Sequence, residues 1–139
     1  MSSYFLIALG SAIGGVARYW CSGLVAQRVG EVFPWGTLAV NVIGSFLIGI
    51  LGAMSEADGR WYADPGARQF LMIGVLGGFT TFSAFSLQTL NLLRDGESLY
   101  AIANVAISVA ACLLAVWFGF VVAAKDRKST RLNSSHPYR

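Results

Sequence analysis

The third apolar stretch of the chain, residues 69–93, reads QFLMIGVLGGFTTFSAFSLQTLNLL. It contains no Asp, Glu, Lys, Arg or His, and about 20 such residues are enough to cross a bilayer as a helix. Its centre is unusual, because adjacent glycines, Gly77 and Gly78, are soon followed by Thr80 and Thr81. Glycine adds backbone freedom, and threonine hydroxyls compete for backbone hydrogen bonds. We therefore expect a membrane-spanning helix that is broken near its middle.

The rest of the chain repeats the same pattern of long apolar stretches between short polar ones. The chain has 139 residues and only 12% of them are charged, against about 25% in soluble domains. Residues 32–55 and 98–124 also lack charged side chains, and 4–26 is interrupted only by Arg18. The expected spans are 4–26, 35–54, 69–93 and 98–124. This length leaves almost no room for a soluble domain, so the expected fold class is an all-α membrane protein with four transmembrane helices.

The end of the chain, residues 125–139, is polar, with no apolar run and no helical periodicity. Residues 129–139 resemble read-through into cloning-vector sequence and are left out of the fold prediction. Residues 1–124 are therefore expected to form the four-span unit. The single histidine, His136, lies in this tail, so no histidine chemistry is expected.

Positive charges outside the spans are nearly balanced between the two sides of the membrane. Four spans put both termini on one side, together with Arg60, Arg68 and Lys125, whereas Arg28 and Arg94 lie on the other. Without the tail beyond Asp126, this is three against two, which gives almost no positive-inside bias. The chain either inserts in both orientations, or the tail is native and holds the termini in the cytoplasm.

Several functional classes are disfavoured by what the spans lack. All acidic residues lie in loops or the tail: Glu31, Glu56, Asp58, Asp64, Asp95, Glu97 and Asp126. A proton-coupled transporter normally keeps a carboxylate at membrane depth. Cys21 and Cys112 form no metal-binding or disulfide pattern and are expected to pack as small hydrophobes. No catalytic grouping or phosphate-binding loop is present, so an enzyme is not expected, and neither is a nucleic-acid partner.

A few polar residues remain inside the spans, where each needs a reason. Arg18 either extends to the membrane interface or is buried beside carbonyls or an anion. Asn41 either joins two helices or lines a pore. Asn104 and Ser108 lie one turn apart on the fourth span. Small-xxx-small patterns, such as Gly10-xxx-Gly14, predict closely packed helices.

The expected break in the third span brings further polar groups to membrane depth. Freed carbonyls suit a small cation such as Na⁺, whereas freed N–H groups and hydroxyls suit an anion. Phe82 and Phe85 share a helix face and either meet lipid and core or turn their electropositive ring edges to an anion. Ser83 and Ser86 add hydroxyl donors beside them. This inventory of donors and ring edges suits an anion that exchanges water for protein contacts.

Three motifs resemble those of the Fluc-type (CrcB-like) fluoride channel family: residues 14–18 (GGVAR), 36–41 (GTLAVN) with Gly44, and 77–86 (GGFTTFSAFS). The resemblance covers residues 4–124. It implies a passive fluoride channel in the inner (plasma) membrane that exports cytoplasmic fluoride and confers fluoride resistance. It also implies an antiparallel, dual-topology homodimer with two pores along the subunit interface.

The same resemblance assigns roles to individual residues. It implies that Asn41, Phe82 and Phe85 line the pores, with the two rings of each pore coming from different subunits. It places Ser83, Ser86 and Ser108 near the ion path and Arg18 near the vestibule. It also implies a structural Na⁺ at the dimer centre, held by backbone carbonyls of Gly77 and Thr80 from both chains.

The fourth span departs from the family pattern, which often has a stripe of hydroxyl side chains there. Cys112 and Val116 interrupt this stripe, so Asn104 and Ser108 are expected to contribute at one end only. Two alternatives remain at this point. A small dual-topology multidrug exporter has a similar size but normally needs an intramembrane Glu, and a non-transporting membrane subunit would show no ion flux of its own.

Overall fold

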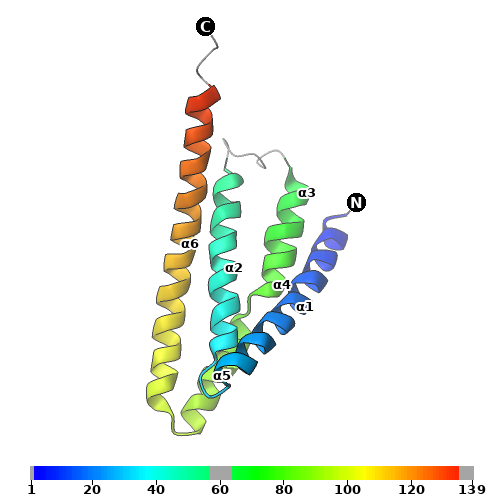
Figure 1. The fold of residues 1–139 in the computed structure, drawn as a ribbon. Helices are drawn as coiled ribbons and strands as arrows, with labels where there is room; N and C mark the ends of the chain where they lie inside the picture. Colours follow the sequence, from blue (N-terminus) through cyan, green and yellow to red (C-terminus); the bar gives the residue numbers. More distant parts are fainter. Residues whose placement is uncertain (1, 57–63, 135–139) are drawn as a thin grey trace.

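Four long helical segments make up the computed structural model, which describes residues 2–56 and 64–134. The first two are α1 (Ser3–Val29) and α2 (Trp35–Met54). The third consists of α3 (Pro65–Arg68), the π-helix η1 (Gln69–Leu76), α4 (Gly77–Phe79) and α5 (Phe82–Arg94), and the fourth is α6 (Ser98–Ser134). All four segments are long and apolar enough to cross a membrane, which confirms the predicted all-α, multi-pass fold. The start of α1 and the end of α6 lie at the same end of the bundle (Figure 1).

The helices pack through glycines that allow two backbones to touch. On one side of the bundle α2 packs against α6 (Figure 1). A Cβ atom added to Gly49 of α2 would overlap the carbonyl oxygen of Val116, and one added to Gly119 of α6 would overlap that of Phe46. Such close contact is the usual basis of helix association in lipid, where no hydrophobic force drives helices together.

On the other side, α1 packs against η1 and α4 in the same way. A Cβ on Gly10 would lie 2.9 Å from the Cα of Gly74, and a Cβ on Gly14 would overlap the carbonyl of Val75. A Cβ on Gly78 would lie 2.6 Å from the carbonyl oxygen of Ser11. The predicted close packing at the Gly10-xxx-Gly14 pattern is therefore confirmed.

The helix ends follow from local sequence. The Ser2 hydroxyl caps α1 by accepting a hydrogen bond from the N–H of Phe5. Gly30, with φ of 89°, ends the same helix, and Gly96, with φ of 77°, forms the predicted tight turn between α5 and α6. Asp64 caps α3 through the N–H of Ala67, so the third span begins at Pro65, earlier than the predicted residue 69.

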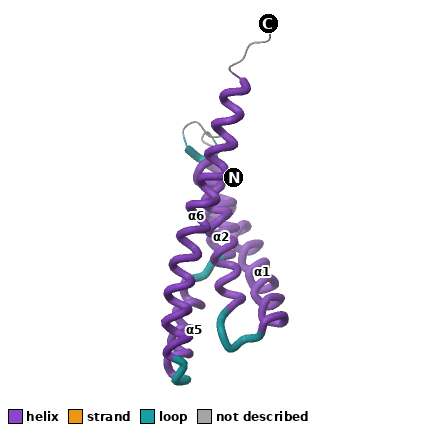
Figure 2. The backbone as a smooth tube through the Cα atoms, turned by 60° about the vertical axis from the view of Figure 1, so that its left-hand side comes forward, coloured by secondary structure: helices purple, strands orange, loops and turns teal. Residues whose placement is uncertain are grey.

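Two residues inside the third span leave the helical conformation. Thr80 has φ −86° and ψ 160°, and Thr81 has φ −152° and ψ 121°, which are extended backbone angles. They form the short loop between α4 and α5 in Figure 2. The Thr81 hydroxyl then caps α5 by accepting from the N–H of Ala84. We call this two-residue segment the α4–α5 joint.

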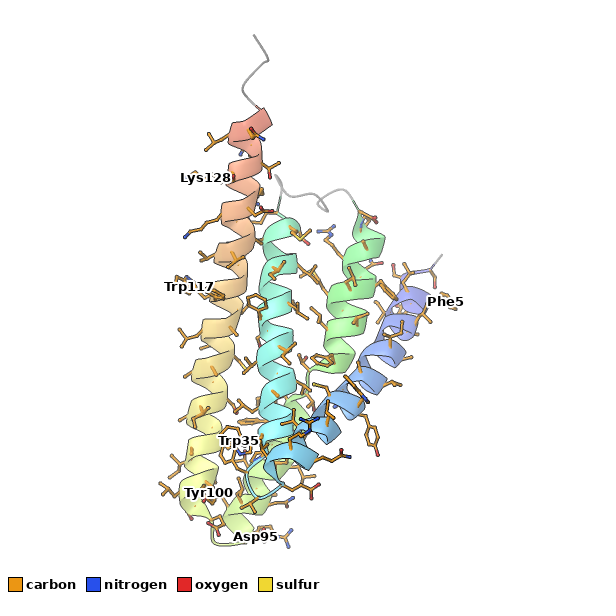
Figure 3. The ribbon with its side chains drawn as sticks, viewed as in Figure 1. Phe5, Trp35, Asp95, Tyr100, Trp117 and Lys128 are labelled. Atoms are coloured by element: carbon orange, nitrogen blue, oxygen red, sulfur yellow. The ribbon has the colours of Figure 1, made fainter. Side chains whose placement is uncertain are left out.

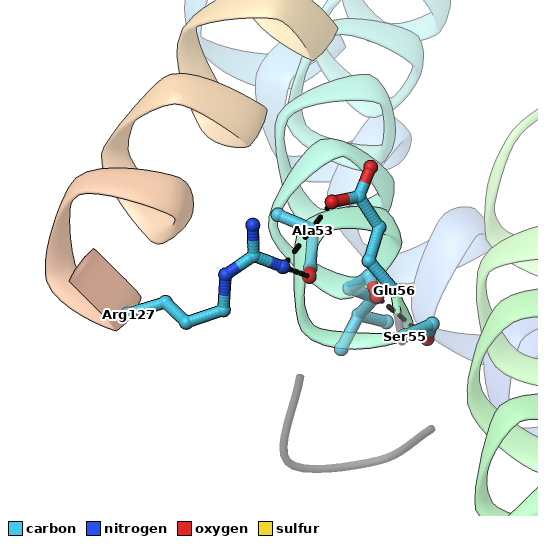
Figure 4. A network of polar contacts seen from close by, with 5 residues as sticks. Ala53, Ser55, Glu56 and Arg127 are labelled. Carbon is cyan, nitrogen blue, oxygen red and sulfur yellow. Dashed lines mark hydrogen bonds and ion pairs between the residues drawn. The ribbon is translucent and has the colours of Figure 1, made fainter. Parts of the chain in front are cut away.

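The fourth helix is longer than its apolar sequence predicts. α6 continues past Ala124 to Ser134, so the prediction of a tail without helix is wrong as far as this residue. The extension packs back on the end of α2: Nη1 of Arg127 donates to the carbonyl oxygen of Ala53 at 3.0 Å and to Oε2 of Glu56 at 3.2 Å (Figure 4). These contacts support the added turns, together with lysine and arginine residues that favour helix. Residues 57–63 and 135–139, which include Asp58, Arg60 and His136, lie outside the described residues.

Aromatic side chains cluster at one end of the apolar region. The rings of Phe33 and Trp35 lie 4.7 Å apart between centroids, and those of Phe33 and Tyr100 lie 6.2 Å apart. Figure 3 shows Trp35 and Tyr100 toward the same end of the bundle as the turn at Asp95, with Trp117 far along α6 from them. Amphipathic rings at the end of a span are typical of a membrane–water interface.

Candidate functional site

Asn41 joins α2 to the α4–α5 joint. Its Nδ2 donates to the carbonyl oxygen of Thr81 at 3.0 Å, and its Oδ1 accepts from the N–H of Thr81 at 2.8 Å. One side-chain amide thus pairs with both backbone groups of a residue that has left the helix. Because unpaired backbone groups are costly at membrane depth, Asn41 stabilises the extended conformation. Asn41 was predicted either to join two helices or to line a pore, and these two hydrogen bonds are direct contacts of the first kind.

The joint changes the hydrogen bonding of two backbone carbonyls. In a continuous helix, Gly77 O would accept from Thr81 N and Thr80 O from Ala84 N. Here the Thr81 N–H donates to Asn41, and the Ala84 N–H donates to the Thr81 hydroxyl. The carbonyls of Gly77 and Thr80 therefore lose their helical partners. Carbonyl oxygens are the ligand type that Na⁺ prefers, so these two residues fit the cation expected from the sequence.

A cavity of about 350 Å³ lies beside the joint and is open on one side. Asn41, Phe82, Phe85 and Ser108 all line it, so the structure brings together four of the predicted pore residues. Its walls come from α2, the third span and α6, with further lining by Gly44, Ser45, Ile48, Met72, Leu76, Gly77, Thr80, Thr81, Val109 and Cys112. Among these described lining residues there is no charged side chain. The cavity offers amides, hydroxyls, a thiol and aromatic rings.

The two phenylalanines stand at the start of α5, on the mouth of this cavity. Their ring centroids are 5.5 Å apart, with the rings tilted by 47°. Phe82 is 79% exposed in the single chain, whereas Phe85 is half-buried. A large aromatic side chain left so exposed at the middle of a span is placed to meet lipid or another protein surface.

Ser108 reaches the cavity from α6 and belongs to a longer set of hydrogen bonds. Its hydroxyl lies 3.3 Å from Oδ1 of Asn104, and Nδ2 of Asn104 lies 2.9 Å from Oγ1 of Thr89. Asn104 is 1% exposed and lies outside the cavity lining. Of the two polar residues expected along the fourth span, only Ser108 therefore contacts the cavity directly.

Three other predicted residues lie apart from the cavity. The Ser86 hydroxyl donates to the carbonyl oxygen of Phe82 at 3.0 Å, and the Ser83 hydroxyl lies 3.4 Å from that of Thr81. Both serines are exposed on α5. Arg18 is half-buried on α1 and forms no hydrogen bond or ion pair with another residue in the described ranges.

A second, larger cavity of about 930 Å³ lies at the end of the bundle where α1 meets α2. Tyr19 and Trp20, which follow Arg18, line it together with Gln88 of α5. Glu31 and Asp95 stand at the same cavity, so its wall carries negative charge. Arg18 itself is not part of the lining.

Two residues at this site were not expected from the sequence. Thr89 bonds to Asn104, but a threonine on an apolar helix has no pattern that reveals such a partner. Cys112 lines the small cavity, although its thiol was expected only to pack. Asn104, Ser108 and Cys112 follow one another at intervals of four residues, and this spacing could have indicated that Cys112 shares the face of Ser108.

Comparison with known proteins places the chain in a family. Residues 5–120 match the sequence model of the protein family described as CrcB-like protein, Camphor Resistance (CrcB). A relative from Methylocella silvestris is 58% identical over 86% of this chain and 92% of its own length, and one from Opitutus terrae is 58% identical over 88% and 93%. A relative from Rhodospirillum rubrum is 50% identical over 86% and 92%. All three are named fluoride-specific ion channel FluC. The chain therefore belongs to the CrcB-like family, as the motifs at residues 14–18, 36–41 and 77–86 predicted.

Proposed function

We propose that the chain is a passive, selective fluoride channel rather than an enzyme. The observation that carries this proposal is the small cavity, in which Asn41, Phe82, Phe85 and Ser108 meet without a charged group. Relatives at 58% identity are named fluoride-specific channels. In the proposed role, the protein lets fluoride leave the cytoplasm across the inner membrane, after fluoride has entered the cell as neutral HF.

Fluoride gives up strongly bound water when it enters a pore, so the protein must replace those contacts. The amide and hydroxyl groups of the cavity are hydrogen-bond donors, and the edges of aromatic rings carry partial positive charge. The α5 helix also begins at the joint, and its first-turn N–H groups favour negative charge. Each contribution is neutral overall, so the anion is stabilised without being trapped by a fixed positive charge.

A second copy of the chain is proposed to close the cavity. The cavity is open on one side and Phe82 is exposed at its mouth, which leaves room for an antiparallel partner. The near balance of Lys and Arg across the membrane permits both orientations. In this dimer, each of two pores would lie along the subunit interface and take its two phenylalanine rings from different subunits.

The centre of the proposed dimer is also where a structural sodium ion would bind. The carbonyl oxygens of Gly77 and Thr80 from both copies would hold it, since these are the carbonyls whose helical donors bond elsewhere. When bound, the ion supplies positive charge that offsets the cost of placing anions in a low-dielectric region. Arg18, Ser83 and Ser86 are proposed to act outside the narrow region, with Arg18 attracting anions in the vestibule.

Ion efflux from proteoliposomes tests the function directly. Purified protein in vesicles loaded with fluoride should release it rapidly when a potassium ionophore balances the charge, whereas vesicles loaded with chloride should retain it. Equal efflux of the two ions would contradict selectivity, and absence of fluoride efflux would contradict the channel itself. Proton-coupled uptake of an aromatic cation would instead support a multidrug exporter.

Cysteine modification tests whether the small cavity lies on the ion path. Cys112 lines this cavity and Cys21 does not, and both thiols are free and half-buried. A negatively charged methanethiosulfonate reagent should therefore reduce fluoride efflux severalfold in wild type and in Cys21→Ser, because it adds bulk and negative charge beside Ser108. Cys112→Ser should be resistant. Equal inhibition of Cys112→Ser would show that the reagent acts at a site other than Cys112.

A further inference from the structure

A chain of three hydrogen bonds connects the cavity wall to the backbone of α5. It runs from the Ser108 hydroxyl to Oδ1 of Asn104 (3.3 Å), from Nδ2 of Asn104 to Oγ1 of Thr89 (2.9 Å), and from Oγ1 of Thr89 to the carbonyl oxygen of Phe85 (2.8 Å). Asn104 is 1% exposed and Ser108 is 8% exposed, so water does not compete freely for these groups. These three hydrogen bonds therefore link two residues of the cavity, Ser108 and Phe85, through two residues outside it.

The carbonyl oxygen of Phe85, at one end of this set of hydrogen bonds, determines which group donates in each of them. The Phe85 carbonyl can only accept, so Thr89 must use its single hydroxyl proton to donate to it. The Thr89 oxygen is then an acceptor, and Asn104 must present its NH₂ group to it. This leaves the Asn104 oxygen facing Ser108, which must donate its own proton to complete the chain.

The consequence concerns what Ser108 offers to the cavity. A serine hydroxyl has one proton, and here that proton points to Asn104 rather than into the cavity. The lone pairs of the oxygen therefore face the space where an anion would pass. For Ser108 to donate to an anion, its hydroxyl must turn away from Asn104, which leaves a buried carbonyl oxygen unpaired.

We infer that Asn104 and Thr89 are positioning residues that weaken the hold of Ser108 on the anion. This inference rests on the proposed function, because it assigns a role within the fluoride path. The Ser108 hydroxyl stays engaged with Asn104 until an anion arrives and returns to it when the anion leaves. A donor held back in this way keeps fluoride binding weak, which favours release and rapid passage over tight binding.

Removing the Thr89 hydroxyl should reverse the hydrogen bond between Asn104 and Ser108. In Thr89→Val, Nδ2 of Asn104 loses its acceptor, and a 180° rotation of the amide lets it donate to Ser108 instead. The Ser108 proton is then free to point into the cavity. We expect the fluoride concentration that gives half-maximal flux to fall about threefold to tenfold, a shift in the range of one hydrogen bond of about 1 kcal/mol. Maximal flux should fall as release slows.

A double-variant comparison separates this role from a general effect on folding. In a Ser108→Ala background, Thr89→Val should no longer shift the half-saturating fluoride concentration, since the hydroxyl on which it acts is absent. Asn104→Leu should shift that concentration in the same direction as Thr89→Val and depend on Ser108 in the same way. Thr130→Val removes an exposed threonine hydroxyl that bonds to a carbonyl of its own helix away from the cavity, and it serves as the matched control, with no shift expected.

The outcomes distinguish the inference from the function on which it rests. If wild-type protein carries no fluoride, the proposed function fails. If wild type carries fluoride but Thr89→Val lowers only maximal flux, or shifts the half-saturating concentration equally with and without Ser108, the positioning role alone is overturned. A shift toward higher fluoride concentration in Thr89→Val would also contradict it.

Discussion

Replacing Asn41 by leucine is expected to abolish fluoride flux. Leucine has the same number and branching of side-chain heavy atoms but can neither donate to the carbonyl of Thr81 nor accept from its N–H. Each unpaired backbone group away from water costs about 1–3 kcal/mol, so the extended joint would lose about 2–6 kcal/mol of support. We expect the Thr81 backbone to seek other partners, which displaces Phe82 and the mouth of the cavity. Fluoride efflux from proteoliposomes measures the loss.

Two further variants assign the cause of that loss. Asn91→Leu removes an exposed amide from α5 that has no role at the joint, and its flux should remain near that of wild type. Asn41→Asp keeps the acceptor for the Thr81 N–H but replaces the donor by a carboxylate. This variant should also be inactive, because its carboxylate faces the Thr81 carbonyl oxygen without a donor and its negative charge repels an anion. Wild-type flux in Asn41→Leu would show that the side-chain amide is not needed.

Replacing Gly49 by alanine is expected to reduce the yield of folded protein strongly. The added methyl group would overlap the carbonyl oxygen of Val116 and lie 3.0 Å from the backbone nitrogen of Phe120. Helix backbone cannot move aside as a side chain can, so α2 and α6 must separate along their contact. Forced overpacking costs about 1–3 kcal/mol and sometimes more. Monodisperse protein recovered after size-exclusion chromatography in mild detergent measures the effect.

The same helix provides the control for this prediction. Gly52 also lies in α2, but a Cβ there has nothing within 4 Å, so Gly52→Ala should retain wild-type yield. Gly119→Ala should resemble Gly49→Ala, because its methyl group would overlap the carbonyl of Phe46 across the same contact. The double variant should be less harmful than the sum of both, since helices that are already apart accept a second methyl group. Equal yields for the variants at 49 and 52 would contradict the close contact.

The spans were predictable because each depends on local composition. A stretch free of charge and long enough to cross a bilayer has few alternatives to a transmembrane helix, so residues 35–54 match α2 at both ends. Prediction was weaker at the polar ends, where capping decides the boundary. Asp64 starts the third helix before residue 69, and Arg127 helps α6 to continue beyond Ala124.

The candidate site was predictable in its members but not in its contacts. The motif at residues 77–86 and the family resemblance named Asn41, Phe82, Phe85 and Ser108, which all line the cavity. Neither indicated that Ser83 and Ser86 would lie on the exposed side of α5, outside that lining. Helical periodicity reports which residues share a face, but the neighbour that a face meets depends on how the helices pack.

The sequence by itself determined that this chain is a four-span membrane protein and that residues 4–26, 35–54, 69–93 and 98–124 carry no acid, and it predicted a weaker helix around residues 77–81. Only the tertiary structure decided that Asn41 holds both backbone groups of Thr81, and that Ser108, Asn104 and Thr89 form one directed set of hydrogen bonds. The physical reason is distance along the chain. Composition and periodicity act over a few turns, whereas an amide 40 residues away becomes a partner only when packing brings it within 3 Å.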